Sequence, residues 1–165
     1  MKTDVYLIRH GIAAERGTYA HDDERPLTNM GDRKTRKVAQ RLHQLQIRFD
    51  LILTSPLVRA RQTAVILKEA NLSPQLELSD YLSPDGDFTG WLAWLAQWRS
   101  SDTDCLALVG HQPNLSNWAE ILTWGSARNQ MVLKKAGIIG MTLPANGSPI
   151  GRSDLFWLTR PRFLL

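Results

Sequence analysis

The stretch VYLIRHG, residues 5–11, decides the fold prediction. Its first four residues are apolar or β-favouring, and such a run predicts a short strand that is buried on both faces. The run stops abruptly at Arg9 and His10, which Gly11 follows. We therefore expect two ionisable side chains at the carboxyl end of a buried strand.

Two later stretches repeat this arrangement. Residues 51–54 (LILT) lead into Ser55, with Arg59 one helical turn further along the chain. Residues 105–109 (CLALV) lead through a single glycine into His111. Ligands of open α/β sheets bind outside the carboxyl ends of the strands. We therefore expect these polar side chains and those of the first strand to converge on one crevice.

Helical patterns separate the predicted strands. Thr28 can cap one helix, while Pro56 suits the first position of a second helix that Ser55 would cap. A third helix with a wide aromatic face is expected at residues 91–98, and a fourth from Pro113 onward. Further short strands are expected at residues 76–78, 137–143 and 155–158.

The alternation of strands and helices predicts the α/β class. We expect a three-layer α/β/α sandwich with a largely parallel central sheet, in which the last two strands could form an antiparallel edge. The chain has 165 residues, no repeat and no linker composition. These features favour a single domain over residues 1–165, without a large cap insertion.

Charge and composition exclude several classes of function. The net charge is +4, but the basic residues are dispersed except at residues 33–37, which a helix would present to solvent, so we expect no nucleic-acid partner. No apolar run approaches the roughly 20 residues of a membrane span, and no signal-peptide pattern is present. We expect a cytoplasmic protein with no membrane partner. The single cysteine, Cys105, is interpreted as a small buried hydrophobe.

The expected crevice combines imidazole and guanidinium groups, and this combination suits phosphoryl transfer. Arginine binds phosphate oxygens bidentately and stays charged at any working pH. A neutral imidazole can attack phosphorus and form a covalent intermediate. No His-x-x-x-His pattern or cluster of Cys and His is present, so we expect neither a metal nor a cofactor.

Three motifs occur in order along the chain and resemble those of the histidine phosphatase (phosphoglycerate mutase-like) superfamily. They are RHG at residues 9–11, SPLVRA at residues 55–60 followed by QTA at residues 62–64, and VGH at residues 109–111. The short chain, together with RPLT at residues 25–28 followed by Gly31, is similar to the small SixA-type phosphohistidine phosphatase branch. The resemblance implies a phosphoglycerate mutase-like fold and no metal.

Catalytic roles follow from this resemblance, position by position. His10 would be the nucleophile that becomes phosphorylated. Arg9 and Arg59 would clamp the phosphoryl oxygens, and His111 would donate a hydrogen bond to an equatorial oxygen. Arg25, Gly11 and Ser55 are the further residues expected to bind substrate.

The chain departs from the family pattern at the proton donor. Many larger members carry a glutamate general acid some 20 residues beyond the second motif, but Tyr81 stands at the corresponding position. Asp80, Asp85 and Asp87 are the candidates to replace that glutamate. An alkoxide leaving group needs a general acid, typically worth about 10²–10⁴-fold in rate, whereas an imidazole can leave without one. The missing glutamate therefore favours phosphohistidine as the substrate.

The function predicted from the sequence is that of a protein phosphohistidine phosphatase acting through a covalent phosphohistidine on His10. Its partner would be a phosphorylated histidine-containing protein, such as a phosphotransfer domain or a histidine kinase, which would place it in signal transduction. One alternative is a small-molecule phosphomonoesterase on the same fold, acting on a phosphorylated metabolite. Another is a non-catalytic phosphohistidine-binding regulatory module.

Overall fold

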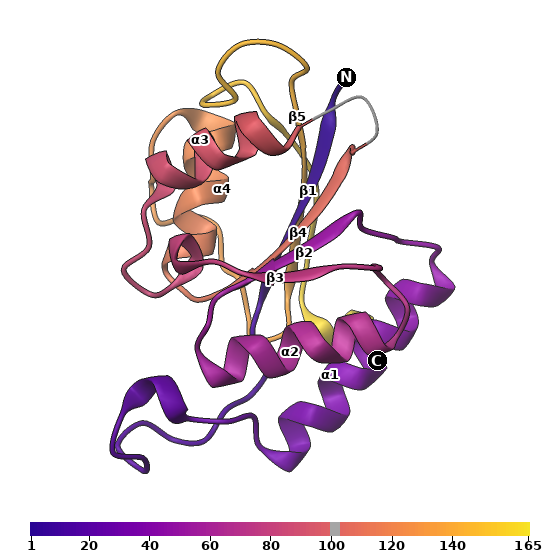
Figure 1. The fold of residues 1–165 in the computed structure, drawn as a ribbon, viewed down its shortest axis with the longest axis vertical. Coiled ribbons are helices and arrows are strands. Elements are labelled where there is room, and N and C mark those ends of the chain that lie inside the picture. The colour runs from indigo at the N-terminus through magenta and orange to yellow at the C-terminus, as the bar shows by residue number, and fades with distance from the viewer. Residues whose placement is uncertain (100–102) are drawn as a thin grey trace.

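A computed structural model describes residues 1–99 and 103–165, and one mixed sheet forms its centre (Figure 1). The strands lie in the order β3-β2-β4-β1-β5-β6. The first four strands of that order are mutually parallel, while β5 runs antiparallel to both β1 and β6. The strand bounds are β1 Thr3–Arg9, β2 Leu51–Thr54, β3 Leu76–Leu78, β4 Cys105–Gly110, β5 Ile138–Leu143 and β6 Asp154–Thr159.

Four helices cover the two faces of the sheet, with α1 and α2 on one face and α3 and α4 on the other (Figure 1). Three short 3-10 turns, η1 to η3, complete the secondary structure of the described residues. The helix bounds are α1 Asn29–Gln44, α2 Val58–Glu69, α3 Phe88–Trp98 and α4 Asn114–Trp124, with η1 at Asp22–Glu24, η2 at Asp80–Leu82 and η3 at Pro161–Phe163.

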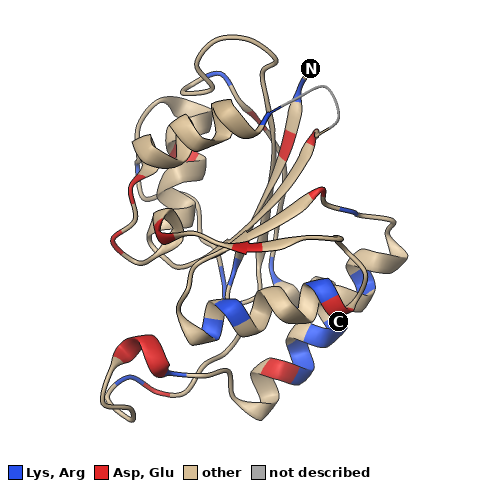
Figure 2. Ribbon diagram, viewed as in Figure 1, with Lys and Arg blue, Asp and Glu red and all other residues tan. Residues whose placement is uncertain are grey.

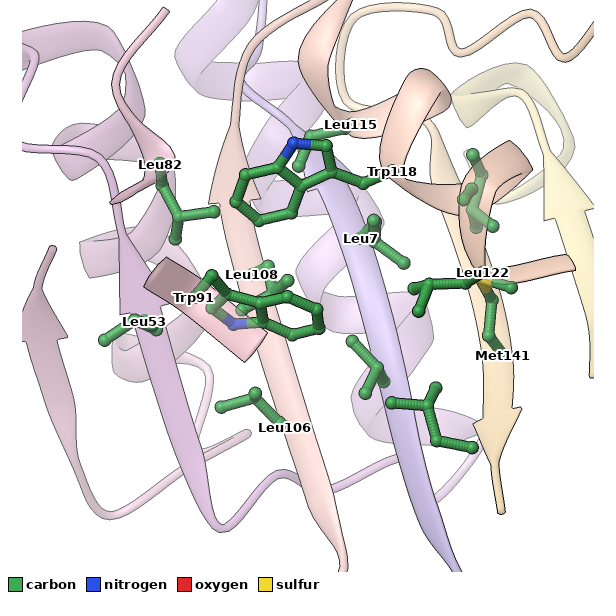
Figure 3. Packing of buried hydrophobic residues seen from close by; sticks show 14 of the residues in the cluster. Leu7, Leu53, Leu82, Trp91, Leu106, Leu108, Leu115, Trp118, Leu122 and Met141 are labelled. Atoms are coloured by element: carbon green, nitrogen blue, oxygen red, sulfur yellow. The ribbon is translucent and has the colours of Figure 1, made fainter. Parts of the chain in front are cut away.

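The sheet is buried on both faces, which explains why its central strands are almost continuously apolar. Side chains of a strand alternate between faces, so Leu51 and Leu53 of β2 pack in the cluster with α3 and α4, whereas Ile52 packs with α1 and α2. On the first face Trp91 of α3 stacks against Trp118 of α4 over the strands, with ring centroids 5.2 Å apart (Figure 3).

The predicted three-layer α/β/α class is confirmed, and so is the antiparallel edge formed by the last two strands. Thr28 caps α1 as expected, because its side chain accepts a hydrogen bond from the Gly31 N–H. The start of α2 was predicted wrongly: it begins at Val58, and neither Ser55 as cap nor Pro56 as first residue belongs to it. The Ser55 hydroxyl instead accepts from the Leu57 N–H, which forms a turn before the helix.

The helices of the described residues give no sign of a membrane span, since none is both long and apolar enough to cross one. Figure 2 shows basic positions along α1 and α2 and at the end of the sheet where the parallel strands finish. In the basic run at residues 33–37, three of the four charged side chains are exposed. The run is therefore mainly a solvated helix face, as predicted.

A buried carboxylate fixes the segment that leads from α4 back toward the sheet. Glu120 is fully buried, and its carboxylate accepts hydrogen bonds from the N–H groups of Arg128, Gln130 and Met131. Burial alone would raise the pKa of Glu120, but these backbone hydrogen bonds outweigh it and hold the pKa below its usual value.

Glu120→Gln is expected to lower the free energy of unfolding by about 1.5–3 kcal/mol at neutral pH, because hydrogen bonds to a charged acceptor are lost. A lowered folded-state pKa means that this stabilisation is present above the unfolded pKa and is lost as the pH falls through the folded pKa. Urea unfolding of wild type and Glu120→Gln measures the difference in the free energy of unfolding, and the exposed Glu77→Gln is the control. Equal stability of wild type and Glu120→Gln would contradict this role.

Candidate active site

The carboxyl ends of β1, β2 and β4 lie side by side and bring together side chains that are far apart in the sequence. The His10 N–H donates to the Gly110 carbonyl over 3.1 Å, and the Ser55 N–H donates to the Val109 carbonyl over 2.9 Å. These backbone bonds continue the ladder of the sheet just beyond its strands. They hold the three segments in register at the predicted crevice.

A pocket of about 370 Å³ opens at this end of the sheet. Of the residues predicted to take part in the site, five line it: Arg9, His10, Arg25, Arg59 and His111. Apart from Arg9, which is half-buried, these residues are at most 7% exposed. The pocket therefore holds both imidazoles and the guanidinium groups of Arg25 and Arg59 in a strongly desolvated setting.

The hydrogen bonding of His10 determines its tautomer. Its Nδ1 lies 2.7 Å from the Gly11 carbonyl oxygen, and because a carbonyl can only accept, Nδ1 carries the proton. The lone pair is then on Nε2, which accepts a hydrogen bond from Nε of Arg59 over 3.4 Å. Burial lowers the pKa of His10 to about 3, with neighbouring His111, Arg59 and Arg9 acting in the same direction. His10 is thus a neutral imidazole with an available Nε2 lone pair at physiological pH.

A serine sets the tautomer of the second histidine. Nε2 of His111 lies 2.8 Å from Oγ of Ser55, and that hydroxyl already accepts from the Leu57 N–H over 3.2 Å. The hydroxyl proton is satisfied when it points at His111 Nε2, which leaves the imidazole proton on Nδ1. Nδ1 is buried and has no hydrogen-bond partner within the described residues. Burial lowers the pKa of His111 to about 4, so the ring is neutral and offers one free N–H.

Two arginines of the pocket, Arg9 and Arg59, are held by groups of the protein. Arg59 donates to the backbone carbonyl of Asp22 over 2.9 Å and to its carboxylate over 3.1 Å. Arg9 donates to the Leu133 carbonyl over 3.1 Å, while its buried Nε has no partner in the part of the chain that the structure describes. A phosphoryl oxygen is a suitable acceptor for such a guanidinium.

Asp22 joins two arginines and was not predicted from the sequence. Its carboxylate accepts from Arg25 Nε over 2.7 Å and pairs with Arg59 on its other oxygen. Arg25 also donates to the Ala14 carbonyl over 2.6 Å. The hydrogen bond from Arg25 and the nearby charge of Arg59 lower the pKa of Asp22, so it is ionised at neutral pH.

Two of the residues expected to bind substrate support the histidines instead. The Gly11 N–H donates to Thr63 Oγ1 over 3.0 Å, and its carbonyl accepts from His10, so both of its backbone groups are engaged. A Cβ at Gly11 would lie 2.4 Å from Thr35 Oγ1, which explains the glycine. Ser55 is fully buried and bonds His111. Neither residue lines the pocket.

The three aspartates considered as general acids do not reach the pocket. Asp80, Asp85 and Asp87 are exposed, and of their segment only Pro84 lines the cavity. The carboxylates that do line it are Asp22 and Glu15, both from the loop after β1. Among the described residues, no group of three or more His, Cys, Asp or Glu side chains is arranged to hold a metal ion.

The low pKa values of His10 and His111 make the stability of the fold depend on pH. A histidine in the unfolded chain binds a proton below its ordinary pKa of 6.5, whereas folded His10 does so only near pH 3. The unfolded state therefore binds more protons in this window, and stability falls as the pH falls from about 6.5 toward 3.

His10→Ala is expected to reduce this acid dependence by about 1.4 kcal/mol per pH unit, because one titrating group is removed. Urea unfolding between pH 7 and the acid range measures the slope for both proteins. The exposed His43→Ala serves as the control for the loss of a histidine side chain outside the pocket. An unchanged slope in His10→Ala would show that His10 titrates normally in the fold.

Comparison with known proteins agrees with this geometry. Residues 5–82, which include Arg9, His10 and Arg59, match the model of the histidine phosphatase superfamily (branch 1). The chain is 48% identical to an uncharacterized protein of Picosynechococcus sp. (strain ATCC 27264 / PCC 7002 / PR-6), over 98% of this chain and 99% of that one. It is 31% identical to the phosphohistidine phosphatase SixA of Escherichia coli (strain K12), over 66% of this chain and 67% of that one.

A solved structure of the protein histidine phosphatase SixA complexed with tungstate superposes with a TM-score of 0.85 at 26% sequence identity. The superposition covers 99% of this chain and 100% of the other, so it includes the region of His111 that lies beyond the residues matched to the family. The chain belongs to the histidine phosphatase superfamily and is a phosphatase.

Proposed function

We propose that the protein hydrolyses phosphohistidine in a protein substrate through a covalent phosphoryl intermediate on His10. The observation that carries this proposal is the state of His10, whose neutral ring leaves Nε2 unprotonated and accepting a hydrogen bond of 3.4 Å from Arg59 Nε. A phosphoryl group bound by Arg59 would replace this contact and meet the Nε2 lone pair. The likeness to SixA, named a phosphohistidine phosphatase in Escherichia coli, supports the same substrate.

In the first step, Nε2 of His10 attacks the phosphorus and forms a P–N bond, while the P–N bond to the substrate imidazole breaks. The attacking ring becomes cationic, and the hydrogen bond from its Nδ1–H to the Gly11 carbonyl stabilises that charge. Arg9 and Arg59 bind the phosphoryl oxygens, and the free Nδ1–H of His111 donates to one of them.

In the second step, water attacks the phosphorus and the bond to His10 breaks. Nε2 recovers its lone pair, inorganic phosphate leaves, and the proton of the attacking water passes to phosphate or solvent. Because His10 has a low pKa, it departs as a neutral imidazole without a further proton. The site is then ready for another turnover.

The ionised state of Asp22 supports an imidazole as the leaving group. Asp22 is kept ionised by Arg25 and Arg59, so it is a poor proton donor at neutral pH. A substrate imidazole protonated on its remote nitrogen, near its usual pKa of about 6.5, leaves as a neutral molecule. No general acid is required for that departure.

A small-molecule phosphomonoesterase is the second candidate, and Glu15 is the observation that favours it. This glutamate is exposed and lines the pocket, so its carboxyl group could protonate an alkoxide. The two functions differ in their need for Glu15, since only an ester substrate requires the acid.

Phosphate release from a phosphorylated histidine phosphotransfer domain and from an unactivated alkyl phosphate tests the proposal. We expect fast release from the domain and slow release from the ester, with Glu15→Gln leaving the first reaction unchanged. Equal rates on both substrates, with the ester reaction lost in Glu15→Gln, would establish the phosphomonoesterase instead. Binding of the domain without any release would overturn phosphohistidine as the substrate.

Ser55→Ala is expected to lower kcat by about 10-fold or more, because His111 loses the group that keeps its proton on Nδ1. Ser55→Thr keeps a hydroxyl group and serves as the conservative variant. We expect a reduced kcat with a nearly constant KM in Ser55→Ala, and recovery of at least part of kcat in Ser55→Thr. Full activity of a folded Ser55→Ala protein would contradict this role of Ser55.

A further inference from the structure

Two basic side chains line the pocket without a partner. Arg16 comes from the loop after β1, and Lys135 comes from the segment before β5. Neither side chain forms an ion pair or a hydrogen bond within residues 1–99 and 103–165, whereas Arg9, Arg25 and Arg59 all donate to protein oxygens. These two exposed cations are therefore free to bind an anion at the mouth of the pocket.

The backbone holds Lys135 next to the reacting histidine. The following residue, Ala136, has a φ of 61° and donates its N–H to the carbonyls of both Arg9 and His10, over 3.0 and 3.1 Å. Its neighbour Lys134 is also exposed but does not line the pocket. The chain thus places one lysine of the pair at the site and the other away from it.

The charges of the pocket do not balance. Its lining contains five cations, Arg9, Arg16, Arg25, Arg59 and Lys135, against the two carboxylates of Glu15 and Asp22. A dianionic phosphoryl group would neutralise two of the three surplus charges, and it would do so on the arginines next to His10. Burial lowers the pKa of Lys135, and the charges of Arg9, Arg25 and Arg16 lower it further. An additional anion would relieve this repulsion.

We infer that Lys135 and Arg16 bind a second anionic group of the substrate, a carboxylate carried on the leaving-group side of the phosphorylated imidazole. In a protein substrate this carboxylate belongs to an aspartate or glutamate beside the phosphohistidine. The inference rests on the proposed function and adds to it a preference for acidic surroundings. Because this carboxylate is bound similarly in the ground state and the transition state, its loss raises KM more than it lowers kcat.

Two matched phosphohistidine peptides test the inference, one with aspartates and the other with asparagines beside the phosphohistidine. N-phosphorylimidazole, which has no carboxylate, is the third substrate. We expect wild type to prefer the acidic peptide through a lower KM. Lys135→Gln and Arg16→Gln should each raise KM for that peptide by about threefold to tenfold, in the range of partly exposed charge pairs. The rise of KM for N-phosphorylimidazole should be much smaller than for the acidic peptide in both variants.

Lys134→Gln is the matched control, since it removes the same charge from the adjacent residue outside the pocket. An equal rise of KM in this control would assign the effect to general charge attraction and overturn the inference. Equal cleavage of the acidic and neutral peptides by wild type would also overturn it, while leaving the proposed function intact. If wild type cleaves none of the three phosphoramidates, the proposed function fails and the inference fails with it.

Free phosphohistidine, whose carboxylate is its own α-carboxyl group, distinguishes the source of the anion. A lower KM for the acidic peptide than for free phosphohistidine and the neutral peptide supports a carboxylate from an acidic residue beside the phosphohistidine of a protein. Preference for free phosphohistidine over every peptide would overturn the acidic-neighbour assignment and indicate an amino-acid substrate.

Discussion

His10→Ala is expected to lower phosphate release by on the order of 10⁴-fold or more while leaving the fold intact, as removal of a covalent nucleophile does in other enzymes. The side chain lies just beyond β1, is 6% exposed and lines the pocket outside the two hydrophobic core clusters, so its removal enlarges the pocket without opening the core. Turnover of a phosphorylated histidine domain, with circular dichroism of the variant, measures both effects.

His43→Ala provides the matched control, because that histidine is exposed on α1 and does not line the pocket. It should retain the wild-type rate. Near-normal turnover in His10→Ala would rule out the covalent mechanism, whatever the substrate. If His10→Ala lost both activity and structure, His10→Asn would replace it as the test, because asparagine fills part of the same space with a polar side chain. This variant must also be inactive.

Arg59→Ala is expected to lower kcat by about 10²–10³-fold, or roughly 3–4 kcal/mol, comparable to the loss of a principal donor to a developing charge. The guanidinium is buried, adjoins His10 Nε2 and is held in place by Asp22. Arg59→Lys keeps the charge but loses the bidentate geometry, so its activity should lie between those of wild type and the alanine variant. Steady-state kinetics of the three proteins measure this order.

Arg61→Ala is the control for this series, since Arg61 is exposed on the same helix and does not line the pocket. It should leave kcat unchanged. If Arg59→Ala lost activity only in proportion to unfolded protein, Arg59 would be a structural residue. A fully active and folded Arg59→Ala would remove the arginine clamp from the mechanism.

The strands and the convergence of the site were predictable because both depend on hydrophobic pattern. A strand buried on both faces must be apolar along its length, and the polar residue that ends it therefore stands out. Arg9, His10 and His111 were recognised in this way, and the structure places all three in one pocket. Arg59 follows from its position one helical turn beyond Ser55, and it lies in the first turn of α2.

The loop after β1 was less predictable, because its residues follow no period. Asp22 lies in η1 and pairs with Arg25 three residues later, a spacing that many unrelated sequences share. Lys135 is held at the pocket by the next residue, Ala136, whose backbone has a left-handed conformation. Glycine or asparagine usually marks this conformation in a sequence, and an alanine does not. Such positions depend on tertiary hydrogen bonds that a local pattern does not contain.

The aspartates near Tyr81 show why position in a motif does not give orientation. Asp80 lies within one residue of the expected glutamate, yet it begins the 3-10 turn η2 and is exposed to solvent. The turn after η2 is tight, since a Cβ at Gly86 would lie 1.9 Å from the Tyr81 carbonyl oxygen. This packing presents Pro84 to the pocket and leaves Asp85 outside it.

The same reasoning explains the error at Ser55. A serine before a proline is a common helix start, and the sequence does not show that the hydroxyl has a partner just beyond another strand. In the structure the Ser55 hydroxyl contacts His111, which lies 56 positions away in the chain. Its contribution is to the tautomer of a histidine and not to the cap of α2.

The central claim is that His10 carries the phosphoryl group during turnover. The most direct measurement is rapid quenching in alkali of wild type reacting with a phosphorylated histidine domain, followed by mass spectrometry of the peptides under conditions that preserve phosphohistidine. We predict an acid-labile phosphoryl group on His10 that forms and decays within the time of one turnover. Phosphate release at the full rate with no phosphorylated His10, or with the group on another residue, would contradict it.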